Sequence, residues 1–205
     1  MSKNPIIVFE GIEGSGKSFH INNVANYLKK KNRKFIMLRE PGGSKNSEKI
    51  RKIILSNKSN FSKTTDLFLY LAARSENIDK IIKNNYKKKI ILIDRFVDST
   101  IAYQHFGMSI NLKLINLINK FLLKNINITF TFLNLVNEKN MKFRLAKRLN
   151  LNRYDKFNMS FYKKVQSGFI KIADKNKKKY LKINSNFDIS LNKKIIINKI
   201  NQLIK

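Results

Sequence analysis

The sequence predicts an open, doubly wound α/β fold: a parallel sheet of five strands with helices on both faces. Short apolar runs alternate with longer amphipathic segments along all 205 residues, which is the pattern of parallel strands connected by helices. The runs are nearly continuous in apolar residues, as in strands buried on both faces. Neither an internal repeat nor a Pro/Gly/Ser-rich linker divides the chain, so we expect a single domain over 1–205.

The elements can be placed in chain order from this alternation. The apolar runs predict strands at 6–10 (IIVFE), 35–39 (FIMLR), 90–94 (IILID), 128–133 (ITFTFL) and 180–183 (YLKI). The amphipathic segments predict helices at 18–31, 47–55, 64–85, 112–124, 138–149, 160–174 and 191–204. Ligands of such sheets bind beyond the carboxyl ends of the strands. The polar residues that end three strands are therefore candidate site residues: Glu10, Arg39 with Glu40, and Asp94 with Arg95.

Composition excludes several classes of protein. The chain is 42% hydrophobic and 11% aromatic, which is typical of a folded domain and not of a disordered one. It has no cysteine, so disulfides and cysteine-ligated zinc are excluded. The start, MSKNP, leads directly into IIVF and is too short for a secretory signal, and nothing approaches the ~20 apolar residues of a membrane span. We therefore expect a cytoplasmic protein with no membrane partner.

The formal net charge is +30, which raises the possibility of a nucleic-acid partner. The lysines accompany many asparagines and isoleucines throughout the chain, as A/T-rich codons would produce, and the basic residues form no single long block. We interpret the charge as a solvated surface and do not predict a nucleic-acid partner. A positive field would still concentrate polyanionic substrates near a cleft.

The segment GIEGSGKS (11–18) matches the phosphate-binding pattern G-x-x-x-x-G-K-[ST] without a mismatch, between a predicted strand and a predicted helix. Its glycines let several N–H groups converge on one anion, and the helix dipole adds to this attraction. We expect Lys17 to reach the β- and γ-phosphates of ATP and the Ser18 hydroxyl to bind Mg²⁺. The expected ATP-binding residues are Gly11, Ile12, Glu13, Gly14, Ser15, Gly16, Lys17 and Ser18. The motif makes the predicted fold a three-layer P-loop NTPase sandwich.

Two further motifs narrow the class of P-loop protein. A GTPase needs N-K-x-D after a later strand, and the only candidate, NKSN at 57–60, lacks the aspartate. The third predicted strand ends in ILIDRF, not in the Asp-Glu of a DNA-linked motor. Asp94 can hold a Mg²⁺-bound water, and Arg95 suits a second phosphate group facing the first. Two phosphate sites at one sheet edge predict a kinase that acts on nucleotides.

Several segments resemble bacterial thymidylate kinases, in the same order along the chain. They are EGIEGSGKS (10–18), REPGGS (39–44), EKIRKIIL (48–55), LYLAAR (69–74) and LIDRFVDSTIAYQ (92–104), with a weaker match at NRYDKFNMSFYKKVQSGF (152–169). The resemblance covers most of the chain. It implies transfer of the γ-phosphate of ATP to dTMP with Mg²⁺, giving dTDP for dTTP synthesis. It also implies a homodimer formed through the helices around 67–81 and 101–123.

The resemblance also implies roles on the acceptor side. Tyr70 is expected to stack on thymine and Arg74 to bond its O4, and their i, i+4 spacing places them on one helix face. Arg39 and Arg95 are expected to clamp the acceptor phosphate, since guanidinium groups bind phosphate oxygens in bidentate fashion. Glu10 is expected to lie between Mg²⁺ and that phosphate. The remaining implied substrate residues are Pro41, Ser99, Tyr103 and Gln104, with Tyr103 crowding a ribose 2′-hydroxyl.

The family supplies extra positive charge either from the P-loop or from a mobile lid. Here the P-loop positions hold Glu13 and Gly14, so we expect a lid, about 143–156, to supply it. We expect Arg148 and Arg153 to be catalytic with Lys17 and Arg95, whereas Arg144 fits a helix surface equally well. The family's D-R-x-E reads N-R-Y-D at 152–155, which predicts that Arg153 is held less firmly.

Two alternatives stay open on the sequence. A deoxynucleoside kinase is also a P-loop enzyme with an arginine after a strand-end aspartate, and comparing dTMP with thymidine as acceptor separates the two. A basic nucleic-acid-binding ATPase predicts DNA-stimulated hydrolysis with a steep salt dependence.

Overall fold

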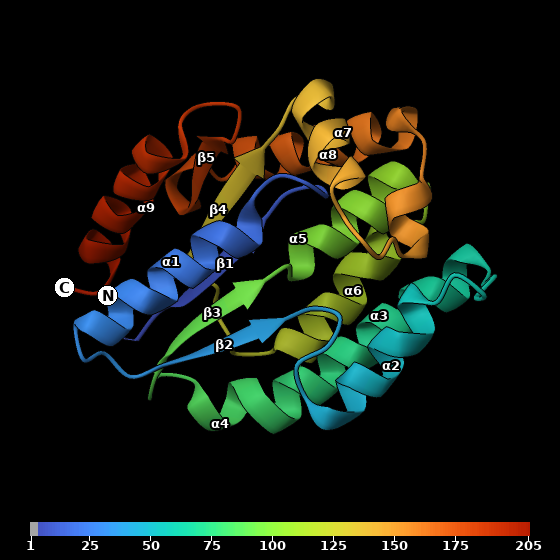
Figure 1. Cartoon of the computed structure of the whole chain (residues 1–205). Helices are drawn as coiled ribbons and strands as arrows, with labels where there is room; N and C mark the ends of the chain where they lie inside the picture. Colours follow the sequence, from blue (N-terminus) through green and yellow to red (C-terminus); the bar gives the residue numbers. More distant parts are fainter. Residues whose placement is uncertain (1–3) are drawn as a thin grey trace.

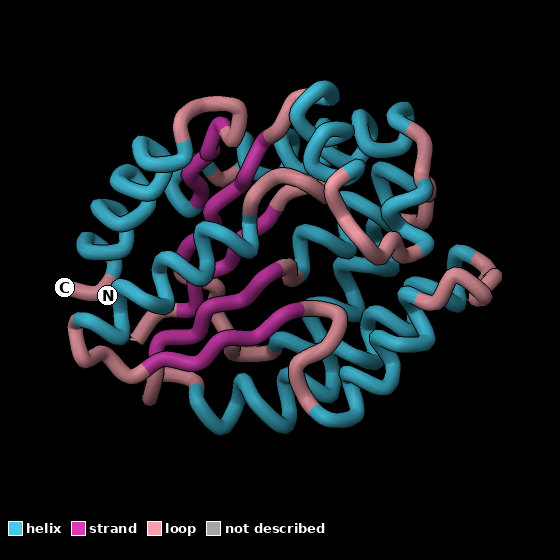
Figure 2. Tube along the Cα trace, in the orientation of Figure 1, coloured by secondary structure: helices cyan, strands magenta, loops and turns pink. Residues whose placement is uncertain are grey.

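Five parallel strands form the central sheet, in the order β2-β3-β1-β4-β5. Figures 1 and 2 show this computed structural model, which describes residues 4–205. The strands are β1 (Ile6–Glu10), β2 (Phe35–Arg39), β3 (Ile90–Asp94), β4 (Phe130–Leu135) and β5 (Tyr180–Asn184). Phe9 of β1 and Arg39 of β2 both pair with Asp94 of β3. The polar ends of the three strands therefore meet at one edge of the sheet, as the sequence predicts.

Helices connect the strands and cover both faces of the sheet. They are α1 (Lys17–Lys30), α2 (Lys45–Leu55), α3 (Lys63–Asn77), α4 (Lys83–Asn85), α5 (Val97–Thr100), α6 (Leu112–Leu123), α7 (Glu138–Ala146), α8 (Met159–Lys175) and α9 (Ile189–Leu203). Two π-helical segments, Ile78–Ile82 and Ile101–Gly107, continue α3 and α5, and short 3₁₀ turns lie at Arg153–Lys156 and Lys177–Lys179. The three-layer α/β class predicted from the sequence is confirmed.

Alternating side chains of the strands build a core on each face, as expected for a sheet buried on both sides. Ile7 and Phe9 of β1 pack with α1 and α9 in one cluster. Ile6 and Val8 point the other way and pack with residues of β3 and the first π-helical segment in a second. In Figure 1, α1 and α9 lie together on one side of the sheet, while α3 and α6 lie beyond the opposite side. This packing holds the strand ends rigidly beneath the site.

Apart from shifts of one or two residues at element ends, such as β4 at Phe130–Leu135 in place of 128–133, the structure differs from the predicted elements at three places. The predicted helix 64–85 is interrupted by a π-helical segment, and the predicted helix 138–149 ends at Ala146. The helical segment 97–107 was not predicted. Its residues Ala102, Tyr103 and Gln104 are consecutive and all buried, and three buried neighbours in a row do not produce the 3.6-residue pattern on which helix prediction depends.

Within residues 4–205 no helix is both long enough and apolar enough to cross a membrane.

Candidate active site

A pocket of about 230 Å³ opens at the carboxyl edge of the sheet. Its walls come from the P-loop, the ends of β2 and β3, helix α3, the segment 95–104 and the segment that follows α7. The predicted site residues that line it are Glu13, Lys17, Ser18, Arg39, Pro41, Tyr70, Arg74, Asp94, Arg95, Ser99, Tyr103, Gln104 and Arg148. One cavity thus joins the predicted phosphate-binding loop to the predicted acceptor residues.

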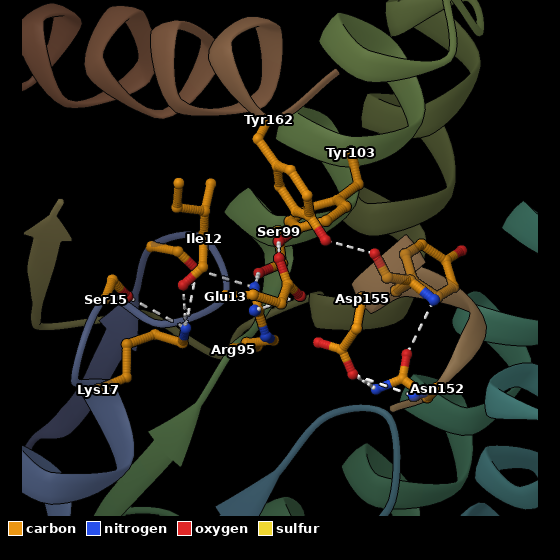
Figure 3. A network of polar contacts seen from close by, with 12 residues as sticks. Ile12, Glu13, Ser15, Lys17, Arg95, Ser99, Tyr103, Asn152, Asp155 and Tyr162 are labelled. Carbon is orange, nitrogen blue, oxygen red and sulfur yellow. Dashed lines mark hydrogen bonds and ion pairs between the residues drawn. The ribbon is translucent and has the colours of Figure 1, made fainter. Parts of the chain in front are cut away.

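The P-loop turns tightly between β1 and α1. Gly11 has φ +140°, and a Cβ at this position would lie 2.3 Å from the carbonyl oxygen of Asn134, so only glycine fits. Lys17 folds back over the loop, where its Nζ donates to the carbonyl oxygens of Gly11 and Ile12, both at 2.9 Å (Figure 3). Burial, together with the nearby charge of Arg95, lowers the pKa of Lys17 to about 8. The ammonium group is thus placed inside the loop in a dehydrated setting.

Ser18 and Asp94 offer a place for a divalent cation. The Ser18 hydroxyl donates to Asp94 Oδ2 (3.0 Å), while Asp94 Oδ1 is buried and has no hydrogen-bond partner in the described chain. Residues 4–205 contain no cluster of three or more histidine, cysteine or acidic residues suited to a metal. Mg²⁺ commonly binds through one or two protein ligands, water and substrate phosphates, so the Ser18 hydroxyl and the Asp94 carboxylate are candidate ligands for it.

Arg95 occupies the centre of the pocket in an unusual backbone conformation. Its φ is +66°, in the left-handed region that residues other than glycine seldom adopt and that costs of order 1–3 kcal/mol. Its guanidinium donates to the Gly11 carbonyl (2.9 Å) and to Glu13 Oε1 (2.8 Å) (Figure 3). The strained backbone directs this side chain back across the P-loop, between the two predicted phosphate sites.

Glu13 and Tyr103 complete the central network. The Tyr103 hydroxyl donates to Glu13 Oε2, and the guanidinium carbon of Arg95 lies 5.2 Å from the centre of the Tyr103 ring. The Glu13 carboxylate thus bridges the phosphate loop and the unpredicted helical segment. This contact places Glu13, which the sequence assigned to ATP binding alone, beside the predicted acceptor residues as well.

Arg74 is almost completely buried, with 1% of its surface exposed. Its guanidinium donates to Glu40 Oε2 (2.8 Å), Asn119 Oδ1 (2.7 Å), the Phe96 carbonyl (2.9 Å) and Thr100 Oγ1 (2.8 Å). A guanidinium has five N–H donors, so one N–H on Nη1 is left over among the described contacts. Arg74 is therefore held in one orientation at the pocket wall and does not point outward to water.

The other predicted base-contacting residues lie in the same wall. Tyr70 is one helical turn before Arg74, and its half-buried ring packs edge-on against Tyr154 (5.8 Å between ring centres). Gln104 is buried, and its amide Nε2 has no hydrogen-bond partner within the described residues. A buried amide donor without a partner is costly, and its presence at a pocket wall points to a ligand that accepts from it.

Two arginines lie at the β2 side of the pocket. Arg39 is 56% exposed and pairs with Glu48 (3.1 Å), so in this structure it has the character of a surface ion pair at the rim. Arg51 donates to the Pro41 carbonyl (2.5 Å) and lines the cavity, a role that was not predicted. Pro41 follows a cis peptide bond in the turn after β2.

The structure separates the two predicted lid arginines. Arg148 lines the pocket and pairs with Asp155 Oδ1 (2.5 Å). Arg153 lies outside the pocket lining: it donates to Asp66 on α3 and to the Ile54 carbonyl at the end of α2. The substitution of N-R-Y-D for D-R-x-E therefore does not leave Arg153 loosely held, because Asp66, 87 positions away, supplies the carboxylate.

Glu10 lies outside the pocket lining, and its predicted position between a metal and the acceptor phosphate stays a prediction. It is buried, and its carboxylate accepts from the backbone N–H of Phe96 (2.8 Å) and from the N–H and hydroxyl of Ser99 (3.2 and 2.6 Å). These contacts give hydrogen-bond acceptors to backbone N–H groups at the start of α5, which have no partner within the helix. Burial, together with repulsion from Asp98, raises the pKa of Glu10 to about 7. Glu10 thus supports the helical segment that follows Arg95 and does not line the cavity.

Comparison with known proteins identifies the family. The model of the thymidylate kinase family matches residues 9–196. The chain belongs to the thymidylate kinase family. A thymidylate kinase of Thermosipho africanus is 39% identical over 168 residues, covering 82% of this chain and 83% of its own length. One from Sulfurihydrogenibium is 36% identical and covers 96% of both chains.

Solved structures of thymidylate kinases agree with this assignment. The crystal structure of thymidylate kinase from Ehrlichia chaffeensis superimposes with a TM-score of 0.79 at 31% identity, covering 97% of this chain and 98% of that one. The resemblance inferred from the sequence motifs is therefore confirmed at the level of family and fold.

Sequence reasoning missed several residues that shape this thymidylate kinase family site. Arg51 lies within EKIRKIIL, one of the segments that carried the resemblance, so the signal was present but was not given a role. Glu40 follows Arg39, the last residue of β2, and was noted without its partner, Arg74. Asp66 and Asn119 gave no local signal, because each acts on an arginine far away in the sequence.

Proposed function

We propose that this chain transfers the γ-phosphate of ATP to dTMP, giving dTDP. One observation carries the proposal: the P-loop residues Lys17 and Ser18 line the same cavity as Tyr70, Arg74 and Arg95. A donor triphosphate at the loop and an acceptor phosphate at Arg95 would meet inside it. Family membership supports the same reaction, and a deoxynucleoside kinase or a nucleic-acid-binding ATPase is not favoured.

On the acceptor side, the base lies between Tyr70 and the wall formed by Arg74 and Gln104. The remaining N–H of Arg74 and the free Nε2 of Gln104 are donors, and thymine carbonyl oxygens are acceptors. Arg39, Arg51 and Arg95 place guanidinium groups around the acceptor phosphate. Ser99 and Tyr103 border the sugar, where the buried Tyr103 ring leaves little room for a 2′-hydroxyl. Deoxynucleotides are therefore preferred.

On the donor side, residues 11–18 surround the triphosphate with backbone N–H groups, and Lys17 reaches its terminal phosphates. Ser18 and Asp94 would hold Mg²⁺, which when bound neutralises charge on the phosphate oxygens. Positioning and charge neutralisation supply most of the catalysis of phosphoryl transfer. The acceptor is already an anionic phosphate oxygen, so no general base is required. Arg95, just after β3, and Arg148, after α7, both line the cavity in which the reacting phosphates would meet.

We further propose a single domain in which the segment after α7 acts as the lid. Of the predicted lid, 143–156, the stretch beyond Ala146 carries Arg148 and ends in the 3₁₀ turn Arg153–Lys156. A cytoplasmic location also stays a prediction.

The deciding experiment is a coupled ADP-release assay over a panel of acceptors, with Mg²⁺ and ATP saturating. We expect dTMP to be turned over best, dUMP less well and UMP least, with thymidine inactive and no turnover once EDTA removes the metal. Because dUMP and UMP differ only in the 2′-hydroxyl, their ratio measures the effect of Tyr103. Thymidine turned over as fast as dTMP would instead identify a deoxynucleoside kinase.

We propose that a second copy of the chain covers α6. Leu117 and Phe121 on α6 are each 67% exposed, Leu114 lies on the same face at i, i+3, i+7 spacing, and Phe68 of α3 is half exposed. Exposed apolar residues at this spacing are typical of a helix that packs on a partner. The family resemblance implies a homodimer through these same helices.

Light scattering on the purified protein should give about twice the mass of one chain. The double variant L117E/F121E should give the mass of one chain, because carboxylates on this face cannot be buried unpaired. The matched control is K113E/K120E, on the same helix, which should remain a dimer. A monomeric wild type would contradict the proposal.

A further inference from the structure

Arg144, near the end of α7, connects two loops at the active site. Its Nη1 donates to the carbonyl oxygen of Gly14 in the P-loop (2.8 Å), and its Nη2 donates to the carbonyl oxygen of Ser185, just after β5 (2.7 Å). Ser185 is itself fixed to the sheet through the bond from its N–H to the Leu135 carbonyl (2.8 Å). The half-buried guanidinium therefore ties the P-loop to the end of the sheet.

The bond to Gly14 determines which way one peptide group of the loop points. A trans peptide is planar, so its C=O and N–H point in opposite directions. With the Gly14 carbonyl held outward by Arg144, the N–H of Ser15 faces the inside of the loop. There it donates to the Ile12 carbonyl (3.3 Å), the same oxygen that accepts from Lys17 Nζ. The Ser15 N–H is thus directed to the side from which Lys17 reaches a phosphate.

Helix α7 packs directly on this turn. Gly14 has φ +68°, and a Cβ on Gly14 would lie 3.3 Å from the Met141 carbonyl and 3.6 Å from the Arg144 Cβ. Within residues 4–205 Arg144 makes no ion pair with a carboxylate. Its charge is therefore not neutralised and adds to the attraction of the loop for phosphate.

We propose that Arg144 is a positioning residue for the donor phosphates: it holds the Gly14–Ser15 peptide in the orientation that directs an N–H into the P-loop. This inference rests on the proposed function, since it takes a nucleoside triphosphate as the ligand of the loop. Arg144 differs in this from Arg148, which faces the pocket itself. The part of the predicted lid that contains Arg144 is accordingly held to the P-loop and to the end of β5.

The test compares R144M and R144K with K142M by calorimetric titration of the full chain, using ATP and inorganic tripolyphosphate in the presence of Mg²⁺. Tripolyphosphate contacts the P-loop without a nucleoside. In R144M we expect the Kd of both ligands to rise roughly tenfold, the scale of one charge-assisted hydrogen bond. R144K should be intermediate, because an ammonium group reaches one carbonyl but does not bridge two. Lys142 is exposed on the same helix and forms an ion pair with Glu138 (2.7 Å), its one such partner within residues 4–205, so K142M should bind as wild type.

Kinetics and NMR supply readouts that a merely structural role would not change. In R144M the KM for ATP should rise while the KM for dTMP and kcat at saturating ATP stay within about threefold of wild type. The ¹⁵N–¹H signal of Ser15 should shift in R144M and not in K142M. An unchanged Kd of R144M for tripolyphosphate would overturn the inference, even if the variant binds ATP more weakly. The lost contact with Ser185, and not the orientation of the Gly14–Ser15 peptide, would then explain the weaker ATP binding. If wild type binds tripolyphosphate but does not phosphorylate dTMP, the proposed function fails and the role of Arg144 is still tested.

Discussion

Replacing Lys17 by methionine should lower kcat by about 10³-fold, the upper range for removal of one preorganised donor to a developing charge. Methionine keeps the length and burial of the side chain but removes the ammonium that donates to the Gly11 and Ile12 carbonyls and to Ser15 Oγ. We propose that the same ammonium contacts the terminal phosphates when ATP is bound. Steady-state kinetics with dTMP measure the loss.

The Lys17 pKa adds a pH dependence to this prediction. Burial lowers the pKa of the Lys17 ammonium to about 8, so the free enzyme loses this charge as the pH rises through 8. ATP should therefore bind more weakly above pH 8 than below it, and binding there should take up a proton because the triphosphate restores the charge. Calorimetry in buffers of different ionisation enthalpy measures that uptake.

K17M should show neither proton uptake nor this pH dependence. K29M, which removes an exposed lysine from the same helix, should retain both. Proton uptake that persists in K17M would assign the titration to another group.

The variant R148M should lose turnover by roughly 10³-fold while its KM for ATP changes by less than about threefold. An arginine that stabilises the transferred phosphoryl group contributes at least this much to kcat. Arg148 lines the pocket and, among the described residues, forms an ion pair with Asp155. The buried Asp155 carboxylate also accepts from the backbone N–H and the side-chain amide of Asn152, so it keeps these partners when Arg148 moves to the reacting phosphates. Single-turnover measurements separate the chemical step from product release.

Two variants show whether this effect belongs to Arg148 alone. K147M changes the preceding residue, whose amine lies over the Phe143 ring (4.0 Å), and should behave as wild type. R153M removes the ion-pair partner of the buried Asp66, and Arg153 is itself 18% exposed against 40% for Arg148, so R153M should lower the melting temperature more than R148M does. If R153M lost turnover as R148M does with no change in melting temperature, Arg153 would be the catalytic arginine.

Local patterns in the sequence were sufficient for the sheet and for one side of the site. The P-loop and the strand end at Asp94 and Arg95 can be recognised from the sequence alone. Their residues are neighbours in the chain, and their spacing is set by strand and turn geometry. The family resemblance added Tyr70 and Arg74, which the structure brings to the same cavity.

What the sequence did not reveal depends on contacts between distant segments. The contacts of Glu10 and Arg153 were not foreseen, because their partners, the first turn of α5 and Asp66, lie 86 to 89 and 87 residues away. Because helix α5 was not predicted, the hydrogen bonds of Glu10 to the start of that helix could not be predicted either. A pairing of one arginine with one of several carboxylates is decided by packing, which local periodicity does not encode.

The tie between Arg153 and Asp66 has a consequence for the order of events in a catalytic cycle. Asp66 lies at i−4 from Tyr70 and i−8 from Arg74 on α3. One helix therefore carries the residues predicted to contact thymine and also the carboxylate that binds Arg153, in the same segment as Arg148. A shift of α3 on binding dTMP would be passed to the segment after α7 through the contact between Asp66 and Arg153. We therefore expect bound dTMP to restrict the segment that carries Arg148 more than ATP does on its own.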